Sequence, residues 1–130
     1  MKFYTNVQLI GNQFLVRGVD NGQRFEFRDE FYPTFFVKSK KDTKYRTLDG
    51  EVVEKVNPGT VRDCREFYKK YEDVDGFSIY GNDRYIYQYI SEKYPEDHID
   101  FDIKRMHLVT IDIEVQSERG FPSVENCDEE

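Results

Sequence analysis

The sequence lacks tryptophan, and it contains cysteine, histidine and methionine only twice each. The two cysteines, Cys64 and Cys127, do not have a metal-ligand spacing, and disulfides are rare in cytosolic proteins, so we expect structural thiols. Apolar runs are only a few residues long, whereas a membrane-spanning helix needs about 20. The start of the chain lacks the apolar stretch of a signal peptide. These absences exclude disulfide-stapled and membrane-spanning classes and predict a cytosolic protein without a membrane partner.

Aromatic and charged residues, by contrast, are abundant. Tyrosine occurs 10 times and phenylalanine 11 times, and 35% of the 130 residues are charged. Such aromatic content argues against disorder, and this length is enough for one domain with a hydrophobic core. The net charge of −7 is uneven: residues 1–58 carry 10 basic and 8 acidic side chains, and residues 59–130 carry 9 and 18. The acidic second part would repel a phosphate backbone unless metal ions or local basic patches intervene.

Short apolar and alternating runs in the first part of the chain predict antiparallel strands. Asn21-Gly22 predicts a hairpin with a type I′ turn, because both residues tolerate positive φ. The connections are short, so the first four strands are expected to form one meander, with Tyr32-Pro33 between the third and the fourth. The predicted strands cover residues 3–10, 14–19, 24–31, 34–37, 45–48 and 51–56.

The second part of the chain predicts two short helices. Thr60 has the character of an N-cap, and Asp63 adds negative charge to the first turn of a helix that ends near Glu72. Together with the strands, these helices predict an α+β fold, an antiparallel β-rich domain with two short helices. The remaining predicted elements are a helix over residues 84–93 and strands over residues 77–80 and 107–115.

The strand predicted over residues 107–115 carries a pair of carboxylates. Thr110, Asp112 and Glu114 share one face, because side chains alternate along a strand, and the two carboxylates are then about 7 Å apart. Mg²⁺ prefers carboxylate oxygens together with water and phosphate, and pairs of such ions assist phosphoryl transfer. Asp112 and Glu114 are therefore candidate metal-binding and catalytic residues. The pattern is short, however, and any half-exposed strand can present Asp-x-Glu to solvent.

A basic stretch and a group of tyrosines are candidate nucleic-acid contacts. Basic side chains neutralise phosphates, and an aromatic ring can stack on a base. The alternative for the basic stretch is a solvated loop. The tyrosines are expected to pack the helices against the sheet, with a base-stacking platform as the alternative. The basic stretch comprises Lys38, Lys40, Lys41, Lys44, Tyr45 and Arg46, and the tyrosines are Tyr68, Tyr71, Tyr80, Tyr85, Tyr87 and Tyr89.

The carboxylate pair lies in the string VTIDIEV, which Gly120-Phe121-Pro122 follows a few residues later. Upstream stand KFYTNVQLIGN, YPTFFV, TKYRTLDG, GTVRDCREFYKKYEDVDGF and DRYIYQYISEKYP. In order and spacing these segments resemble the N-terminal region of family B DNA polymerases of T-even-type phages, above all those of T-even-like cyanophages. VTIDIEV resembles their first exonuclease motif. The resemblance covers essentially all 130 residues, so it is far more specific than the motif alone.

This resemblance implies a domain plan and a set of partners. Residues 1–103 would form the polymerase N-terminal domain, and residues 104–130 would begin a truncated RNase H-like exonuclease domain with residues 107–115 as its first strand. Asp112 and Glu114 would be two of four carboxylates that hold Mg²⁺ in a two-metal 3′→5′ exonuclease. The implied partners are template and primer DNA, the rest of the polymerase chain and the polymerase's own messenger RNA. The implied location is the cytoplasm of the infected bacterium.

Three functional classes remain open for the chain. The first is a part of a DNA-directed DNA polymerase with proofreading, which we expect to be inactive alone because the ligand set is incomplete. The second is a module that binds single-stranded nucleic acid, including RNA in translational self-repression. The third is a docking subunit of a split polymerase. Restored primer extension on mixing with the remaining polymerase would favour docking, and nucleic-acid affinity without it would favour the binding module.

Overall fold

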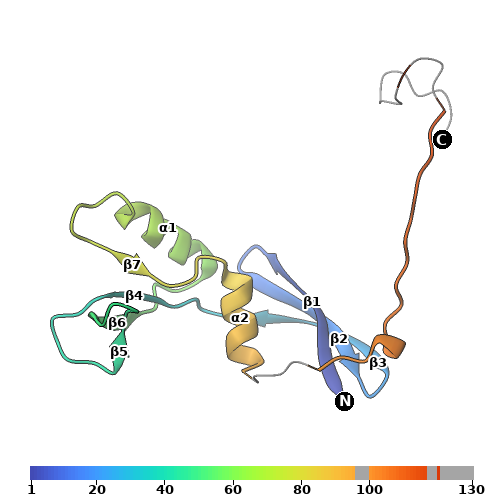
Figure 1. Ribbon diagram of the computed structural model, residues 1–130, viewed down its shortest axis with the longest axis horizontal. Helices are drawn as coiled ribbons and strands as arrows, with labels where there is room; N and C mark the ends of the chain where they lie inside the picture. Colours follow the sequence, from blue (N-terminus) through green and yellow to red (C-terminus); the bar gives the residue numbers. More distant parts are fainter. Residues whose placement is uncertain (96–99, 117–119, 121–130) are drawn as a thin grey trace.

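The structure, a computed structural model, describes residues 1–95, 100–116 and 120 of the chain. Two small antiparallel sheets and two helices form the body, and the segment after the body extends away from it (Figure 1). The α+β class predicted from the sequence, antiparallel and β-rich with two short helices, is confirmed. In the part of the chain that the structure describes, no helix has the length and apolar character needed to cross a membrane.

The first sheet is a meander of β1 (Lys2–Ile10), β2 (Gln13–Asp20) and β3 (Gln23–Glu30). Asn21 and Gly22, which join β2 to β3, have φ values of 48° and 84°. Positive φ at both central positions is what a type I′ turn requires. The predicted hairpin is therefore confirmed.

The second sheet contains β4 (Phe35–Lys38), β5 (Tyr45–Arg46), β6 (Val52–Val56) and β7 (Ile79–Tyr80), in the order β5-β6-β4-β7. The prediction of one meander running through β4 is therefore wrong. Pro33, between β3 and β4, is fully buried. Proline has no backbone N–H to donate to a ladder. The chain consequently leaves the first sheet here, and β4 becomes a central strand of the second.

Both predicted helices are confirmed, as α1 (Val61–Tyr71) and α2 (Tyr85–Lys93). Thr60 caps α1 in a capping box: its side chain accepts a hydrogen bond from the Asp63 backbone N–H, and the Asp63 carboxylate accepts one from the Thr60 backbone N–H at 2.9 Å. Two otherwise unpaired backbone donors are satisfied in this way, which fixes where the helix begins.

The core of the body is aromatic and lies beneath α2. Phe14 stacks on Tyr89 with ring centroids 4.8 Å apart, and Phe31 meets both rings edge-on. The Tyr89 hydroxyl donates a hydrogen bond of 2.9 Å to the Asp29 carboxylate, so this buried ring keeps a partner for its polar end. These contacts attach α2 to the first sheet.

The link between the two sheets is held by a pair of hydrogen bonds from α2. The Thr34 backbone N–H donates to the Gln88 side-chain oxygen at 2.8 Å, and the Gln88 side-chain amide donates to the Thr34 carbonyl at 3.0 Å. Thr34 directly precedes β4, so the two bonds fix the chain at the point where it passes from one sheet to the other.

The strand predicted over residues 107–115 is not confirmed. After a short 3-10 helix, η1 (Ile103–Arg105), the structure assigns no strand to these residues, and they run as an extended chain away from the body (Figure 1). A strand is defined by backbone hydrogen bonds to a neighbour, and no strand in the described part of the chain pairs with these residues. The RNase H-like sheet and the boundary between residues 103 and 104 therefore stay predictions.

Candidate metal and nucleic-acid sites

Asp112 and Glu114 lie two positions apart on this extended segment, and both side chains are exposed. Their chemistry suits a hard divalent ion, because carboxylate oxygens are the donors that Mg²⁺ prefers. Within residues 1–95, 100–116 and 120, no group of three or more potential ligands converges on a point. The described chain thus supplies at most part of a metal site, and the assignment of these two residues remains a prediction.

The isoleucines beside the carboxylates are exposed as well. The relative exposure is 81% for Ile111 and 71% for Ile113. Alternation along an extended chain puts these residues on the face opposite Asp112 and Glu114. Such a pattern is typical of a strand with one buried face and one polar face. The described body does not cover the apolar face. Of the downstream Gly-Phe-Pro, only Gly120 is described, and Phe121 and Pro122 lie outside the described residues.

The predicted basic stretch does not form one continuous cationic surface. Lys38 pairs with Glu51 at 3.4 Å, and Arg46 pairs with Asp42 at 2.8 Å. The pairs are exposed, so each contributes little to stability, yet each acidic partner offsets a positive charge that a phosphate would otherwise meet. The charge available for nucleic acid is therefore smaller than the sequence indicates.

Tyr45, the aromatic residue of that stretch, already contacts neighbouring side chains. The Tyr45 ring lies 5.1 Å from the Phe36 ring, and the Lys44 ammonium sits 5.3 Å from the Tyr45 centroid. Lys40 and Lys41 are exposed and make no ion pair with any residue that the structure describes. Two lysines on an edge loop can contact phosphate, but the stacking partner is half-buried. A nucleic-acid role for this stretch stays a prediction.

The tyrosines divide into two groups. Tyr85 and Tyr89 are buried, which confirms that they pack α2 against the body. Tyr68 is partly buried against the same core. Tyr87 is 56% exposed, so packing does not explain it. The exposed ring is the one tyrosine of the helix pair whose position suggests contact with another molecule.

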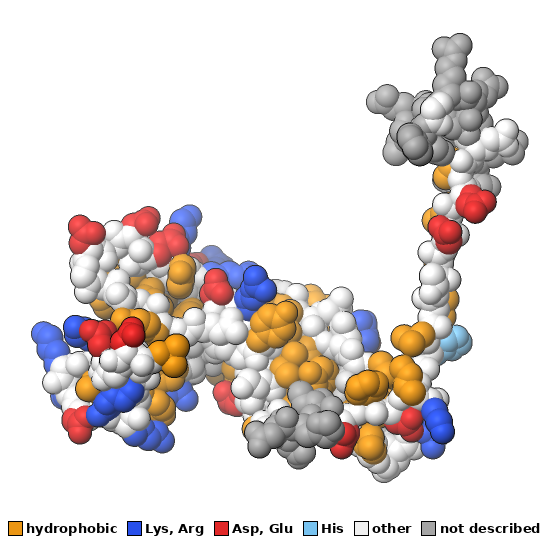
Figure 2. Space-filling model, viewed as in Figure 1, with side chains coloured by type: hydrophobic (Ala, Val, Ile, Leu, Met, Phe, Trp, Pro, Cys, Tyr) orange, Lys and Arg blue, Asp and Glu red, His pale blue; other side chains and the backbone are white. Residues whose placement is uncertain are grey.

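A groove between α1 and α2 is the feature that sequence reasoning missed. Its volume is about 680 Å³, inside the range of about 300–1,000 Å³ that is usual for ligand sites. Figure 2 shows Lys and Arg side chains next to hydrophobic ones where α1 meets α2. We call it the α1–α2 groove, and its lining comprises Val7, Leu9, Arg65, Tyr68, Lys69, Asp83, Arg84, Tyr85, Ile86 and Tyr87.

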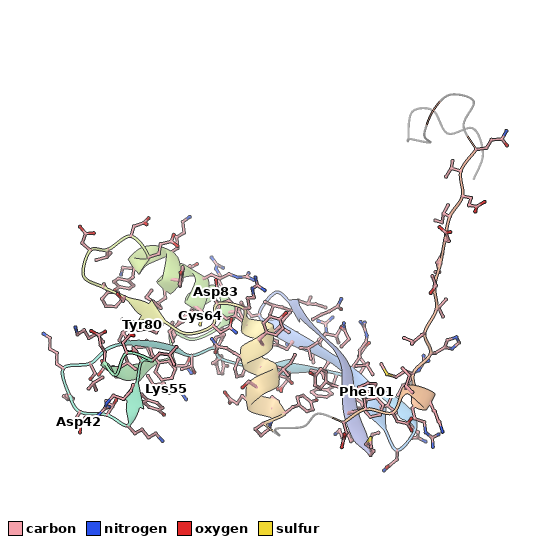
Figure 3. All side chains as sticks on the ribbon, in the orientation of Figure 1. Asp42, Lys55, Cys64, Tyr80, Asp83 and Phe101 are labelled. Carbon is pink, nitrogen blue, oxygen red and sulfur yellow. The ribbon has the colours of Figure 1, made fainter. Side chains whose placement is uncertain are left out.

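The charges of the α1–α2 groove come from two segments of the chain, α1 and the residues just before α2. Arg65 and Lys69 stand one turn apart on α1, and Arg84 precedes α2. Asp83 is the acidic member of the lining, at the junction of the helices (Figure 3). The four-residue spacing of Arg65 and Lys69 was a visible signal in the sequence. Only the fold reveals that Arg84 and Tyr87 join them.

Cys64 is a structural thiol, as predicted. It is fully buried on α1, and its Sγ lies 3.7 Å from the carbonyl oxygens of Pro33 and Gly59. Burial, followed by the nearby Asp63 carboxylate, raises the pKa of the Cys64 thiol to about 11. A thiol that is buried and protonated is a poor nucleophile and a poor metal ligand. Cys127 lies outside the described residues.

Comparisons with known proteins point to one class of enzyme. The chain is 29% identical over 122 residues to a DNA-directed DNA polymerase of Enterobacteria phage T4, and 30% identical over 124 residues to that of Escherichia phage RB69. Each alignment covers 93% of this chain. The chain spans only 13% and 14% of the length of these relatives. No protein-family model matches the sequence. The predicted resemblance to the DNA polymerases of T4-like phages is confirmed.

Proposed function

We propose that this chain is the N-terminal part of a phage replicative DNA polymerase of family B, and that it carries the first carboxylates of a 3′→5′ proofreading exonuclease. The observation that carries the proposal is the similarity over 93% of the chain to two phage DNA polymerases. The fold supports a division near residue 103, because the packed body precedes that point and the carboxylate segment follows it. Residues 1–103 would then be the N-terminal domain and residues 104–130 the start of the exonuclease domain.

In this proposal Asp112 and Glu114 would hold Mg²⁺, together with carboxylates from the rest of the polymerase. When bound, paired ions supply an activated water and stabilise the leaving oxygen in phosphodiester hydrolysis. The two side chains would fix the position of those ions relative to the 3′ end of the DNA. The part of the chain that the structure describes supplies an incomplete ligand set, and Mg²⁺ tolerates distorted geometry poorly. We therefore expect no hydrolysis or extension of DNA by the isolated chain.

The test compares the isolated chain with the complete polymerase in which it stands. In the complete enzyme, Asp112→Ala should lower the rate of single-stranded DNA degradation by at least about 100-fold, and primer extension should persist. Asp73→Ala, which removes an exposed acid from the body, serves as the matched control and should leave both rates unchanged. Exonuclease activity unaffected by Asp112→Ala would remove the assignment. Degradation of DNA by the isolated chain, reduced by the same substitution, would show that the site is complete within it.

Two further roles are supported by particular observations. The exposed apolar face of residues 107–115 favours docking against another part of the polymerase, which would supply the missing sheet. The α1–α2 groove favours binding of single-stranded nucleic acid, with template DNA, primer DNA or the polymerase's own messenger RNA as candidates. The setting proposed for all of these roles is the cytoplasm of the infected bacterium. Mixing the chain with the remaining polymerase separates them, because docking would restore extension and the binding role would not require it.

A further inference from the structure

The short helix η1 rests on the turn that joins β2 to β3. If a side chain began at Gly22, the three atoms nearest to its Cβ would all belong to the Arg105 guanidinium, with Nη1 at 3.2 Å. Gly22 also has a φ of 84°, which few residues other than glycine adopt. Glycine at this position therefore gives the guanidinium room to lie on the turn. Figure 1 shows η1, in orange, beside this end of the first sheet.

Asp102 restricts the position of the Arg105 side chain over the turn. Its carboxylate accepts a hydrogen bond from the Lys104 backbone N–H at 3.0 Å and lies 3.8 Å from Arg105 Nε. An exposed ion pair of this kind contributes little to stability. Its main effect is on direction, because it limits where the guanidinium can point while η1 keeps its shape.

The turn beneath Arg105 is itself tied to the start of the chain. The Met1 ammonium donates a hydrogen bond to Asn21 Oδ1 at 2.9 Å, and the Asn21 backbone N–H donates one to the Met1 carbonyl at 3.0 Å. Three segments that are distant in the sequence thus meet at one place: residue 1, residues 21–22 and residues 102–105. We call this meeting point the η1 junction.

Beyond Arg105 the body holds the chain only loosely. A cavity of about 490 Å³ lies between residues 105–108 and the strands of the first sheet. Leu108 and Val109 are 75% and 68% exposed. The η1 junction is therefore the place where the body fixes the direction of the segment that carries the carboxylates.

A small rotation at the η1 junction moves these carboxylates a long way. Seven residues separate Arg105 from Asp112, and an extended chain of that length spans about 23 Å. A rotation of about 10° would then displace Asp112 by about 4 Å, which is the spacing of two catalytic metal ions. A misplacement of about 1 Å can already slow a reaction about 100-fold. The anchoring of η1 is consequently important for where a site at Asp112 stands relative to the body.

We propose that Arg105 is a positioning residue: by anchoring η1 on the β2–β3 turn, it sets where Asp112 and Glu114 stand relative to the body. The proposal rests on the exonuclease role proposed above for these carboxylates. A primer end held by the polymerase reaches the exonuclease only if the two parts keep a fixed spatial relation, whereas a short single strand binds from solution. Arg105 therefore matters for the removal of a mismatched primer end and not for hydrolysis itself.

The test uses the complete polymerase and two substrates. Arg105→Ala should slow removal of a mismatched 3′ end from a primer–template about 10- to 100-fold, and hydrolysis of a short single strand at saturating concentration should keep its rate. Arg105→Lys retains a cation beside Asp102 and should recover most of the loss. Lys104→Ala is the matched control, because the Lys104 side chain makes no ion pair or hydrogen bond with any residue that the structure describes. It should change neither rate.

A second variant tests the partner of Arg105. Asp102→Asn keeps an oxygen that can cap η1 but removes the charge beside the guanidinium, so removal of the mismatched end should slow again. Asp102 and Arg105 act through one contact, and the loss in the double variant should therefore not exceed the loss in Arg105→Ala alone.

A distance measurement on the 130-residue chain checks the positioning directly. Nitroxide labels are attached at Asp73→Cys on the body and at Leu108→Cys beyond the η1 junction, both of which are exposed. Cys127 is replaced by serine, and the buried Cys64 stays unlabelled. The labels should show one narrow distribution of distances, which Arg105→Ala broadens and Lys104→Ala leaves unchanged.

Three results would overturn the proposal. The first is an equal loss on both substrates in Arg105→Ala, which would indicate general damage to the site. The second is the same loss in Lys104→Ala, which would indicate an effect of net charge. The third is an unchanged removal rate or an unchanged distance distribution in Arg105→Ala. Failure of the proposed enzyme role has a different signature, because single-strand hydrolysis would then survive Asp112→Ala while the distance measurement would still test Arg105.

Discussion

Large apolar side chains are buried in the body of the protein but exposed in the segment that follows it. Phe14 and Phe35 are fully buried, whereas Ile111 and Ile113 are 81% and 71% exposed. Burial of a large apolar side chain contributes roughly 1.5–3 kcal/mol relative to exposure. The body therefore has its own source of stability. The segment has the alternating pattern of a strand with one apolar face, but the described body does not cover that face, so its apolar residues add nothing to the stability of the body.

The strongest test of this contrast is a truncation in the core. Phe14→Ala removes the ring that stacks on Tyr89 and meets Phe31, and a buried phenylalanine costs about 3–5 kcal/mol when cut to alanine. We expect the free energy of unfolding in urea to fall by that amount. A loss below about 1 kcal/mol, close to the average for any substitution, would show that the body is not organised around this ring.

A smaller loss is expected at the start of α1. Thr60→Ala removes half of the capping box and should lower the free energy of unfolding by about 1 kcal/mol. Thr60→Ser keeps a hydroxyl at the same position and serves as the control. Equal stability of the alanine and serine variants would mean that the capping hydroxyl contributes nothing.

The same capping box predicts a dependence on pH. Hydrogen bonds from the Thr60 backbone and then from its side chain hold the pKa of the Asp63 carboxyl below its ordinary value of 3.8. A lowered folded pKa means that the contribution is present above that ordinary value and is lost as the pH falls through the folded pKa. Melting curves across this acid range should therefore show a smaller decline for Asp63→Asn than for the unaltered chain.

The smallest effect is expected in the extended segment. Ile111→Ala and Ile113→Ala truncate apolar side chains as Phe14→Ala does, but the residues are exposed, and exposed substitutions usually change stability by less than about 0.5 kcal/mol. Urea unfolding of each variant should overlay that of the unaltered chain. A loss similar to that of a core truncation would mean that the segment packs against the body, and the contrast between the two regions would disappear.

The sequence predicts those parts of the fold that depend on neighbouring residues. The Asn21-Gly22 turn and the Thr60–Asp63 capping box are local patterns, and both occur where they were predicted. The helices also lie within one or two residues of the predicted bounds. Turn and cap chemistry acts over three or four residues, so one segment of sequence contains all the information needed.

Features that depend on distant residues were harder to predict. The transfer of β4 to a second sheet depends on its pairing with β6 and β7, and pairing partners are not fixed by the alternation within a strand. The pairing of Lys38 with Glu51 and the assembly of the α1–α2 groove are likewise tertiary. For the carboxylates, alternation predicts their shared face, but no ligand from elsewhere in the described chain completes the set.

The burial of Cys64 gives the body a built-in reporter of its own opening motions. The thiol is fully enclosed between α1 and the carbonyls of Pro33 and Gly59, so a thiol reagent can reach it only while α1 is detached. With Cys127 replaced by serine, the rate of labelling would follow the fraction of molecules that are open at any moment. Addition of an oligonucleotide should slow the labelling, because a ligand that bridges α1 and α2 favours the closed form.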